Sequence, residues 1–167
     1  MVVMKIYLRE LFFVASMCML SFAAFAQSEN PFIGTWDLDA ANSDFGAAPV
    51  PNATTRTYIE TGDGGYMYLV VTINQDGSIG GSSASYRYDG ENNSIATIGG
   101  NGAQTTISYY FVNGRTVEYT IRNAGRTTQI GAKTLSPDSR VLTIVIQNIN
   151  PDGGNSSSQI LRFNRRV

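Results

Sequence analysis

The sequence predicts an all-β fold, an antiparallel up-and-down β-barrel of about 8–10 strands. Beyond the N-terminal region no stretch shows a sustained helical period, whereas runs of strand-forming residues of similar length recur. Turn dipeptides such as Asp-Gly and Asn-Gly separate these runs. Because no helix lies between them, successive strands must pair antiparallel, which excludes a parallel α/β sheet. So many strands hide their edges only by closing on themselves or by folding into two layers.

Residues 1–26 are predicted to be a secretory signal peptide, and residues 27–167 a single β-barrel domain. Lys5 and Arg9 precede an apolar run over 11–26, and Ala24-Phe25-Ala26 has the small-x-small pattern of a cleavage site. The run is shorter than the roughly 20 residues of a membrane-spanning helix, which argues against a retained N-terminal anchor. We therefore expect export to a periplasm or the extracellular space, with no transmembrane helix after cleavage.

In the first half of the domain, Gly- and Asp-rich turns bound the expected strands. Gly62–Gly65 and Asp76-Gly77 each separate two runs, and Asp89-Gly90 ends the next. Residues 40–52 are rich in Ala, Asn, Pro and Gly, and we expect a loop with room for one helical turn. The predicted strands are Thr35–Asp39, Thr54–Thr61, Tyr66–Asn74, Ile79–Tyr88 and the short run Ser94–Ile98.

In the second half, the strongest turn signal is Asn113-Gly114 between two alternating runs, since both residues accept a positive φ. Further turns are expected at Asn123–Gly125, Pro137-Asp138 and Pro151–Gly154. The predicted strands are Thr105–Val112, Arg115–Arg122, Thr127–Leu135, Arg140–Asn148 and Ser156–Arg165.

The faces of several strands follow from residue parity. In 115–122 the residues Val117, Tyr119 and Ile121 share an apolar face, and in 105–112 the partner face carries Tyr109 and Phe111. The runs 66–74 and 140–148 are apolar on both faces, which suits a covered barrel wall, a sandwich or a subunit contact. The strand 79–88 begins with small Gly and Ser residues, which indicates either space in a cavity or strong curvature.

Composition argues against several classes of function. The chain has no His, and its single Cys, Cys18, lies in the predicted signal peptide, so the usual general base and thiol nucleophile are missing. The net charge of −1 and the absence of a basic run argue against a nucleic-acid partner. Asp37 and Asp39 share one side of a strand, but surface acids are expected there. We predict no enzyme activity, no metal site and no cofactor.

Short motifs are spread over most of the domain: Gly34-Thr35-Trp36-Asp37-Leu38-Asp39, Ser43-Asp44-Phe45, Arg56-Thr57-Tyr58, Tyr86–Gly90 and Phe163-Asn164-Arg165. In this pattern the chain resembles exported bacterial lipocalin-like proteins of calycin type, a group without a transferable activity. The resemblance implies that Gly34 and Trp36 close one barrel end. It also implies a cation–π contact between Trp36 and an arginine of the last strand, Arg162 or Arg165.

Intracellular fatty-acid binders hold a carboxylate with an Arg-x-Tyr pair in the last strand. Here Arg162-Phe163-Asn164 places Asn at the Tyr position, and alignment on Phe163 places Leu161 at the Arg position. The pair is incomplete in either alignment, so fatty acid is not the ligand that the resemblance implies.

Tyrosines are the main candidate ligand-binding residues, because a ligand pocket is mostly apolar and aromatic with few polar groups. We select Tyr68, Tyr109 and Tyr119, with Arg122 to orient an acidic ligand. The alternative explanations are that strand propensity alone enriches Tyr and that Arg122 is a solvated residue on a strand face.

The sequence therefore predicts an exported protein that binds a small hydrophobic or amphipathic ligand in the barrel interior. One alternative is a structural or interaction module whose barrel is filled by its own side chains, and another is a small outer-membrane barrel. The bulky residues Trp36, Phe111, Tyr119 and Phe163 favour a filled interior, whereas the Gly/Ser run at 79–85 favours a cavity. No oligomeric state is predicted.

Overall fold

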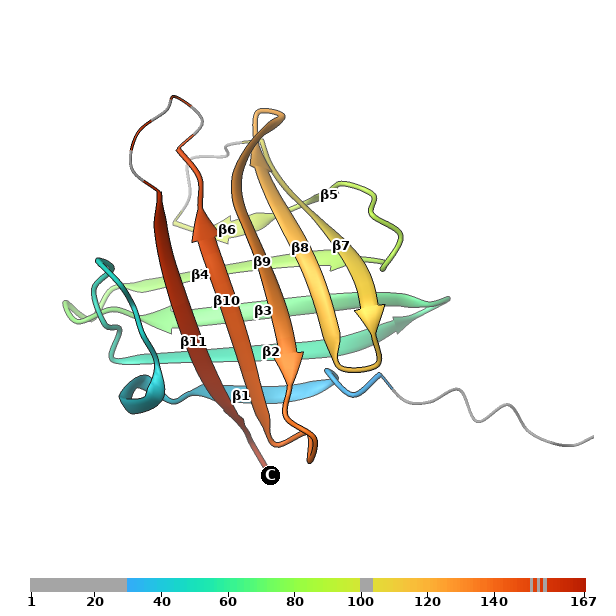
Figure 1. Ribbon diagram of the computed structural model, residues 1–167, viewed down its shortest axis with the longest axis horizontal. Coiled ribbons are helices and arrows are strands. Elements are labelled where there is room, and N and C mark those ends of the chain that lie inside the picture. Colours follow the sequence, from blue (N-terminus) through green and yellow to red (C-terminus); the bar gives the residue numbers. More distant parts are fainter. Residues whose placement is uncertain (1–29, 100–103, 151, 153, 155) are drawn as a thin grey trace, which may run out of the picture.

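Eleven antiparallel strands form one sheet that curls into a nearly closed barrel in the computed structural model (Figure 1). The structure describes residues 30–99, 104–150, 152, 154 and 156–167; the predicted signal peptide, 1–26, lies outside them. The strands are β1 Gly34–Leu38, β2 Ala53–Gly62, β3 Gly65–Ile73, β4 Ile79–Tyr86, β5 Asn93–Ser94, β6 Ala96–Ile98, β7 Thr105–Asn113, β8 Thr116–Asn123, β9 Arg126–Leu135, β10 Val141–Asn148 and β11 Ser157–Arg165. The predicted all-β, up-and-down fold class is confirmed.

Closure of the barrel depends on two pairings. The first and last strands, β1 and β11, pair with Trp36 opposite Arg165. At the other seam, β6 pairs with β4 and β5 pairs with β7, so the single segment 93–98 joins both edges of the sheet. The run predicted as one strand divides at Ile95, whose side chain packs against the core. This division takes the strand count above the expected range.

The strands lie in two crossing layers, with β2–β4 running at a steep angle to β8–β11 (Figure 1). The segment between β1 and β2 lies beside β11 and carries one turn of 3-10 helix, Ala40–Asn42. It is fixed there by two backbone hydrogen bonds between Asp44 and Ile160, of 2.7 and 2.8 Å. The loop at 40–52 with one helical turn is therefore present as expected. No helix within the described ranges is long and apolar enough to span a membrane.

The hairpin predicted at Asn113-Gly114 is present, but its turn differs from the expected kind. Neither residue has a positive φ. Instead, the register of β7 and β8 shifts between Phe111 and Asn113, and Asn113 Oδ1 accepts a hydrogen bond of 2.9 Å from the Arg115 backbone N–H. Phe111, assigned to the apolar face, stays in register with the buried Val117, and its ring centre lies 5.5 Å from that of Tyr88. Its side chain is nevertheless 50% exposed near the end of β7.

The barrel interior is lined by aromatic and aliphatic side chains that alternate with outward residues. On β3, Tyr68 and Val70 are buried and Leu69 is exposed, and on β8, Val117 and Tyr119 are buried as parity predicts. Each fully buried large side chain contributes about 1.5–3 kcal/mol relative to exposure. The core therefore follows the inner face of a continuous curved sheet.

One end of the barrel is closed around Trp36, whose side chain is fully buried. The Trp36 Nε1–H donates to the Phe32 carbonyl at 3.0 Å, and the Arg165 Cζ lies 4.1 Å from the centre of the Trp36 ring. Arg165 also donates to the Ile33 carbonyl at 2.8 Å. At Gly34, φ is 132° and a Cβ would lie 2.8 Å from the Arg165 Nη1. Glycine is thus required for this closure.

Of the two arginines predicted to contact Trp36, only one lies on the inner face of β11. Arg165 makes the contact, whereas Arg162 is exposed on the outside of β11 and does not close the barrel. The reason is the strand's alternation: Leu161, Phe163 and Arg165 share the inner face, so Arg162 must point outward.

Candidate functional site

Five inward tyrosines meet in the barrel interior, and we call them the tyrosine cluster: Tyr58, Tyr68, Tyr86, Tyr109 and Tyr119. They come from β2, β3, β4, β7 and β8, and all are buried. Register brings Tyr58 opposite Tyr68, and Tyr109 opposite Tyr119. The ring centres of Tyr86 and Tyr109 lie 4.2 Å apart, and those of Tyr109 and Tyr119 lie 6.1 Å apart. The rings therefore fill this part of the interior.

A single amine lies at the centre of the tyrosine cluster. Lys133, on β9, is only 4% exposed, and its Nζ donates to the Tyr109 Oη at 2.9 Å. The Nζ lies 4.1 and 4.5 Å from the ring centres of Tyr109 and Tyr58, and 5.8–5.9 Å from those of the other three cluster tyrosines. Lys133 thus has one hydroxyl partner and a surrounding of aromatic faces.

The electrostatics of the tyrosine cluster oppose ionisation. Burial, followed by repulsion from Arg56, lowers the pKa of Lys133 well below its usual value. Burial likewise raises the pKa of Tyr109, Tyr68 and Tyr119, because a phenolate loses its hydration there. No cluster of His, Cys, Asp and Glu suited to a metal occurs among the described residues.

A second interior cation, Arg56, lies on β2 two residues from Tyr58. Its Nε and the Tyr58 Oη are both buried and make no hydrogen bond of full geometry among the described residues, although the Arg56 and Tyr58 side chains interact with each other. Burial alone lowers the pKa of Arg56, but the phenols of Tyr58 and Tyr119 outweigh it and the pKa is raised, so the charge is retained. Burial raises the pKa of Tyr58, although the adjacent guanidinium opposes the shift.

Arg56 faces a pocket of about 190 Å³ inside the barrel, which we call the end pocket. Strands β1, β2, β3 and β11 and the segment after β1 form its walls. The guanidinium carbon of Arg56 lies 5.2 Å from the ring centre of Phe163, which keeps the charged group against the pocket wall. The lining residues are Leu38, Phe45, Ala48, Pro49, Pro51, Thr54, Arg56, Val70, Thr72, Asn74, Gln159, Leu161 and Phe163.

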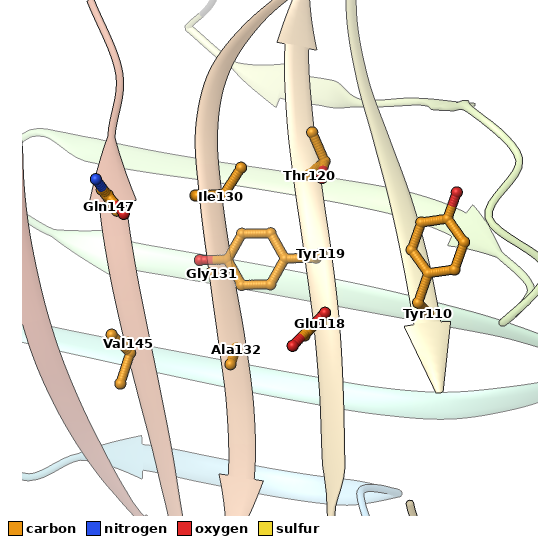
Figure 2. Close-up of a pocket in the computed structure, with 9 residues that line it drawn as sticks. All are labelled: Tyr110, Glu118, Tyr119, Thr120, Ile130, Gly131, Ala132, Val145 and Gln147. Carbon is orange, nitrogen blue, oxygen red and sulfur yellow. The ribbon is translucent and has the colours of Figure 1, made fainter. Parts of the chain in front are cut away.

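A larger hollow, about 460 Å³, lies on the outer wall over β7–β10 (Figure 2). Figure 2 shows the Tyr119 ring lying across Gly131 on the neighbouring strand. A Cβ at Gly131 would be 2.5 Å from the Tyr119 Oη. The charged residue of this hollow, Glu118, is exposed to solvent. In the end pocket the Nε of the charged residue, Arg56, is buried. The end pocket is therefore the better ligand site, because its charge is shielded from water and lies beside apolar walls.

The residues selected from sequence are placed in two groups. Tyr68, Tyr109 and Tyr119 come together in the tyrosine cluster, and none of them lines the end pocket. Arg122 is remote from both: its Nη1 donates to Asn92 Oδ1 at 2.9 Å and to Ser108 Oγ at 3.2 Å. Whether any of these four residues binds a ligand stays a prediction.

Sequence reasoning missed Arg56, Tyr58 and Lys133 as interior polar groups. A signal for each was present. Lys133 lies between Gly131 and Leu135 at the parity of the inner face, and it is the only lysine beyond residue 26. Arg56 and Tyr58 share one face of their strand by the same rule. Because charged residues are rarely buried, sequence reasoning assigns Arg and Lys to the surface even where parity points them inward.

No protein-family model matches the chain, and no curated protein matches its sequence. Solved structures do resemble its fold. A mutant of the fluorescent protein UnaG matches with a TM-score of 0.55 and 9% identity, over 82% of this chain and 97% of that one. Rv2717c from M. tuberculosis matches with a TM-score of 0.56 and 16% identity, over 84% of this chain and 96% of that one. The fold is thus a calycin-like β-barrel.

Proposed function

We propose that this chain is an exported lipocalin-like binding protein that takes a small hydrophobic or amphipathic molecule into the end pocket. The observation that carries the proposal is the pocket itself, which has apolar walls from Leu38, Phe45 and Phe163 and one charged group, Arg56. Ligand sites have this composition, mostly apolar with a few polar groups that fix orientation. The calycin-like fold supports the proposal, because barrels of this size hold one small ligand.

Binding would be an equilibrium burial of apolar surface, which contributes about 25 cal/mol per Å² of ligand area removed from water. Most side chains of the pocket are held by strands β1, β2, β3 and β11, which limits the ordering that opposes binding. Nothing in this mechanism requires bond making or breaking. The predicted absence of catalysis stays a prediction.

A second candidate function is a structural or interaction module with a filled barrel. The observation in its favour is the tyrosine cluster, whose rings and Lys133 occupy the interior between β2, β4 and β7. Under this alternative the end pocket is a packing defect of the barrel. The two candidates differ in whether the purified protein holds or takes up a ligand.

Native mass spectrometry of the protein purified from its own host, with organic extraction of bound material, tests the proposal. We expect a stoichiometric adduct below the size of a drug-like ligand and a polypeptide mass that begins at Gln27. A clean apo mass, with no change in Trp36 fluorescence across a panel of small lipophiles, would favour the filled-barrel module. A polypeptide mass that includes residues 1–26 would contradict export with cleavage.

A further inference from the structure

We propose that the end of the barrel opposite the end pocket carries a second binding site, which takes a neutral oligosaccharide. The site is separate from the end pocket in its residues and in its class of ligand. Three observations support it: a group of partly exposed aromatic rings, two adjoining pockets whose charges cancel, and hydrogen bonds that hold the surrounding segments in place.

The second site lies at the other ends of the strands that form the end pocket. On β3, Tyr66 near the first residue belongs to the second site, and Thr72 near the last residue belongs to the end pocket. On β2 the order is reversed, with Thr61 near its end and Thr54 near its start. The second site is therefore at the β2–β3 turn, on the right in Figure 1. No described residue lines both the end pocket and the second site.

Three aromatic rings of this region form a partly exposed group, which we call the aromatic strip: Tyr66, Tyr88 and Phe111. The ring centres of Tyr66 and Tyr88 lie 5.0 Å apart, and those of Tyr88 and Phe111 lie 5.5 Å apart. Phe111 is 50% exposed, and the two tyrosines are half-buried. Apolar side chains gathered at the surface mark an interaction site. A sugar ring has a face of C–H groups that can cover such rings while its hydroxyls stay at the edge.

Two pockets meet at Tyr66, which lines both. One, of about 390 Å³, follows the aromatic strip and is also lined by Pro31 and Arg115. The other, of about 500 Å³, lies at the β2–β3 turn and is lined by polar residues such as Asp63 and Arg87. Ligand sites in proteins have volumes of about 300–1,000 Å³. Two adjoining pockets of this size suit a chain of linked units better than one small molecule.

The charged groups that line these two pockets cancel. Asp63 and Asp89 supply two carboxylates, and Arg87 and Arg115 supply two guanidiniums. A ligand with a net charge of either sign gains no overall attraction from such a lining. A carboxylate only accepts hydrogen bonds and a guanidinium only donates them, whereas a hydroxyl does both. A neutral ligand with many hydroxyls can therefore bond to all four groups, which neither an anionic acid nor an ammonium can do.

Hydrogen bonds hold the walls of the second site in place. The Arg87 Nη1 donates to the Asp63 carbonyl, which ties the segment after β4 to the β2–β3 turn. A guanidinium has five N–H donors, so Arg87 keeps others for a ligand. The Asn30 Nδ2 donates to the Tyr88 Oη at 3.0 Å and fixes that ring of the aromatic strip. Groups that are already positioned lower the ordering cost of binding.

Isothermal titration calorimetry of the purified protein tests the site with tetrasaccharides of different charge. The neutral probes are cellotetraose, maltotetraose and tetra-N-acetylchitotetraose, and the charged probes are tetragalacturonate and the deacetylated chitosan tetramer. We expect at least one neutral tetrasaccharide to bind about tenfold or more tightly than its monosaccharide, because one sugar ring covers only one of the two pockets. Neither charged probe should bind more tightly than that neutral one, because the lining charges cancel.

Substitutions in the pocket along the aromatic strip assign the binding. Phe111→Ser removes a half-exposed ring and should lower the affinity about tenfold, whereas Phe111→Tyr keeps the ring and should bind as the wild type does. Val112→Ser is the matched control, because Val112 is 52% exposed and lines neither pocket. Arg115→Met should lower the affinity severalfold, and Arg140→Met, at an exposed position outside both pockets, should not. Should Phe111→Ser not fold, Arg115→Met tests the same pocket.

Leu161→Phe, which changes the end pocket, separates the two sites. Sugar binding that Phe111→Ser weakens and that Val112→Ser and Leu161→Phe leave unchanged would establish the second site, whatever the end pocket holds. No binding of any neutral tetrasaccharide, or binding that Leu161→Phe weakens and Phe111→Ser does not, would overturn the inference and leave the end-pocket proposal standing. Tighter binding of a charged probe would overturn the assignment of a neutral ligand.

Discussion

The two regions of the barrel interior, the tyrosine cluster and the end pocket, treat a buried cation in opposite ways. In the cluster, five rings and one hydroxyl surround Lys133, and burial shifts its pKa toward the neutral amine. In the end pocket, Arg56 retains its charge and its Nε has no partner among the described residues. The same sheet thus gives Lys133 a hydrogen-bond partner but gives none to the Arg56 Nε.

This difference indicates which part of the barrel interior is core and which part can bind a ligand. A region whose polar groups are satisfied and whose volume is filled by side chains behaves as core. A region with an unpaired charge and unfilled apolar volume is prepared for a partner. Each prediction below changes one region and uses the other as its control.

The largest effect should come from truncating a ring of the tyrosine cluster. Tyr109→Ala removes a fully buried ring and the hydroxyl partner of Lys133, and should lower the free energy of unfolding by about 3–5 kcal/mol. The counterpart at the end pocket, Phe45→Ala, should cost less than about 1.5 kcal/mol because that side chain is only half-buried. Urea unfolding at neutral pH measures both. Similar costs for the two variants would contradict the division of the interior into core and pocket.

A medium effect should follow from adding volume. Val117 is buried opposite Lys133, so Val117→Phe overpacks the core and should destabilise by about 1–3 kcal/mol. Leu161→Phe puts a larger side chain into the end pocket and should change stability by no more than about 0.5 kcal/mol. The Leu161 variant should nevertheless weaken binding of a ligand in the end pocket. If both substitutions are tolerated equally well, the cluster is less filled than its geometry indicates.

The smallest effect is a change in how stability depends on pH. Lys133 has a lowered pKa in the folded protein, so between that value and 10.5 the unfolded chain binds more protons. Stability therefore rises with pH over this window, by at most about 1.4 kcal/mol per pH unit. The buried tyrosines have raised pKa values, so stability falls above about pH 10, where unfolded tyrosines ionise first.

Lys133→Met should abolish the rise below pH 10 and keep the fall above it, since the tyrosines remain. The free energy of unfolding from urea titrations at several pH values measures the slope. Arg56→Met should keep most of the rise, because burial is the larger cause of the lowered Lys133 pKa and repulsion from Arg56 is the second. A wild-type stability that is flat over this window would mean that Lys133 titrates as an exposed lysine does.

Much of the fold could be predicted from the sequence because strand and turn signals are local. The alternation in 115–122 gave the inward face of Val117 and Tyr119, and the turn dipeptides gave most strand limits within two residues. The division of 93–98 into two strands could not be predicted in this way. It depends on Ile95 turning toward the core at the seam, a contact with residues remote in sequence.

The candidate site was predicted less completely. Parity placed Tyr68, Tyr109 and Tyr119 inside the barrel, but it could not say which inward positions would be filled and which would border a pocket. Arg122 was expected either to orient a ligand or to lie solvated on a strand face, and its hydrogen bonds to Asn92 and Ser108 place it outside both groups. The choice between Arg162 and Arg165 was likewise decided by the register of β11 against β1.

The sequence by itself determined the all-β class, the order of the hairpins and the inward face of most strands, because backbone alternation and turn chemistry act over a few residues. Only the tertiary structure decided that Lys133 has Tyr109 as a partner and that the Arg56 Nε has no full hydrogen bond among the described residues, because those relations arise from side chains of β2, β7 and β9 meeting across the barrel. Local patterns specify which residues enter the interior. The closure of the sheet specifies what they meet there.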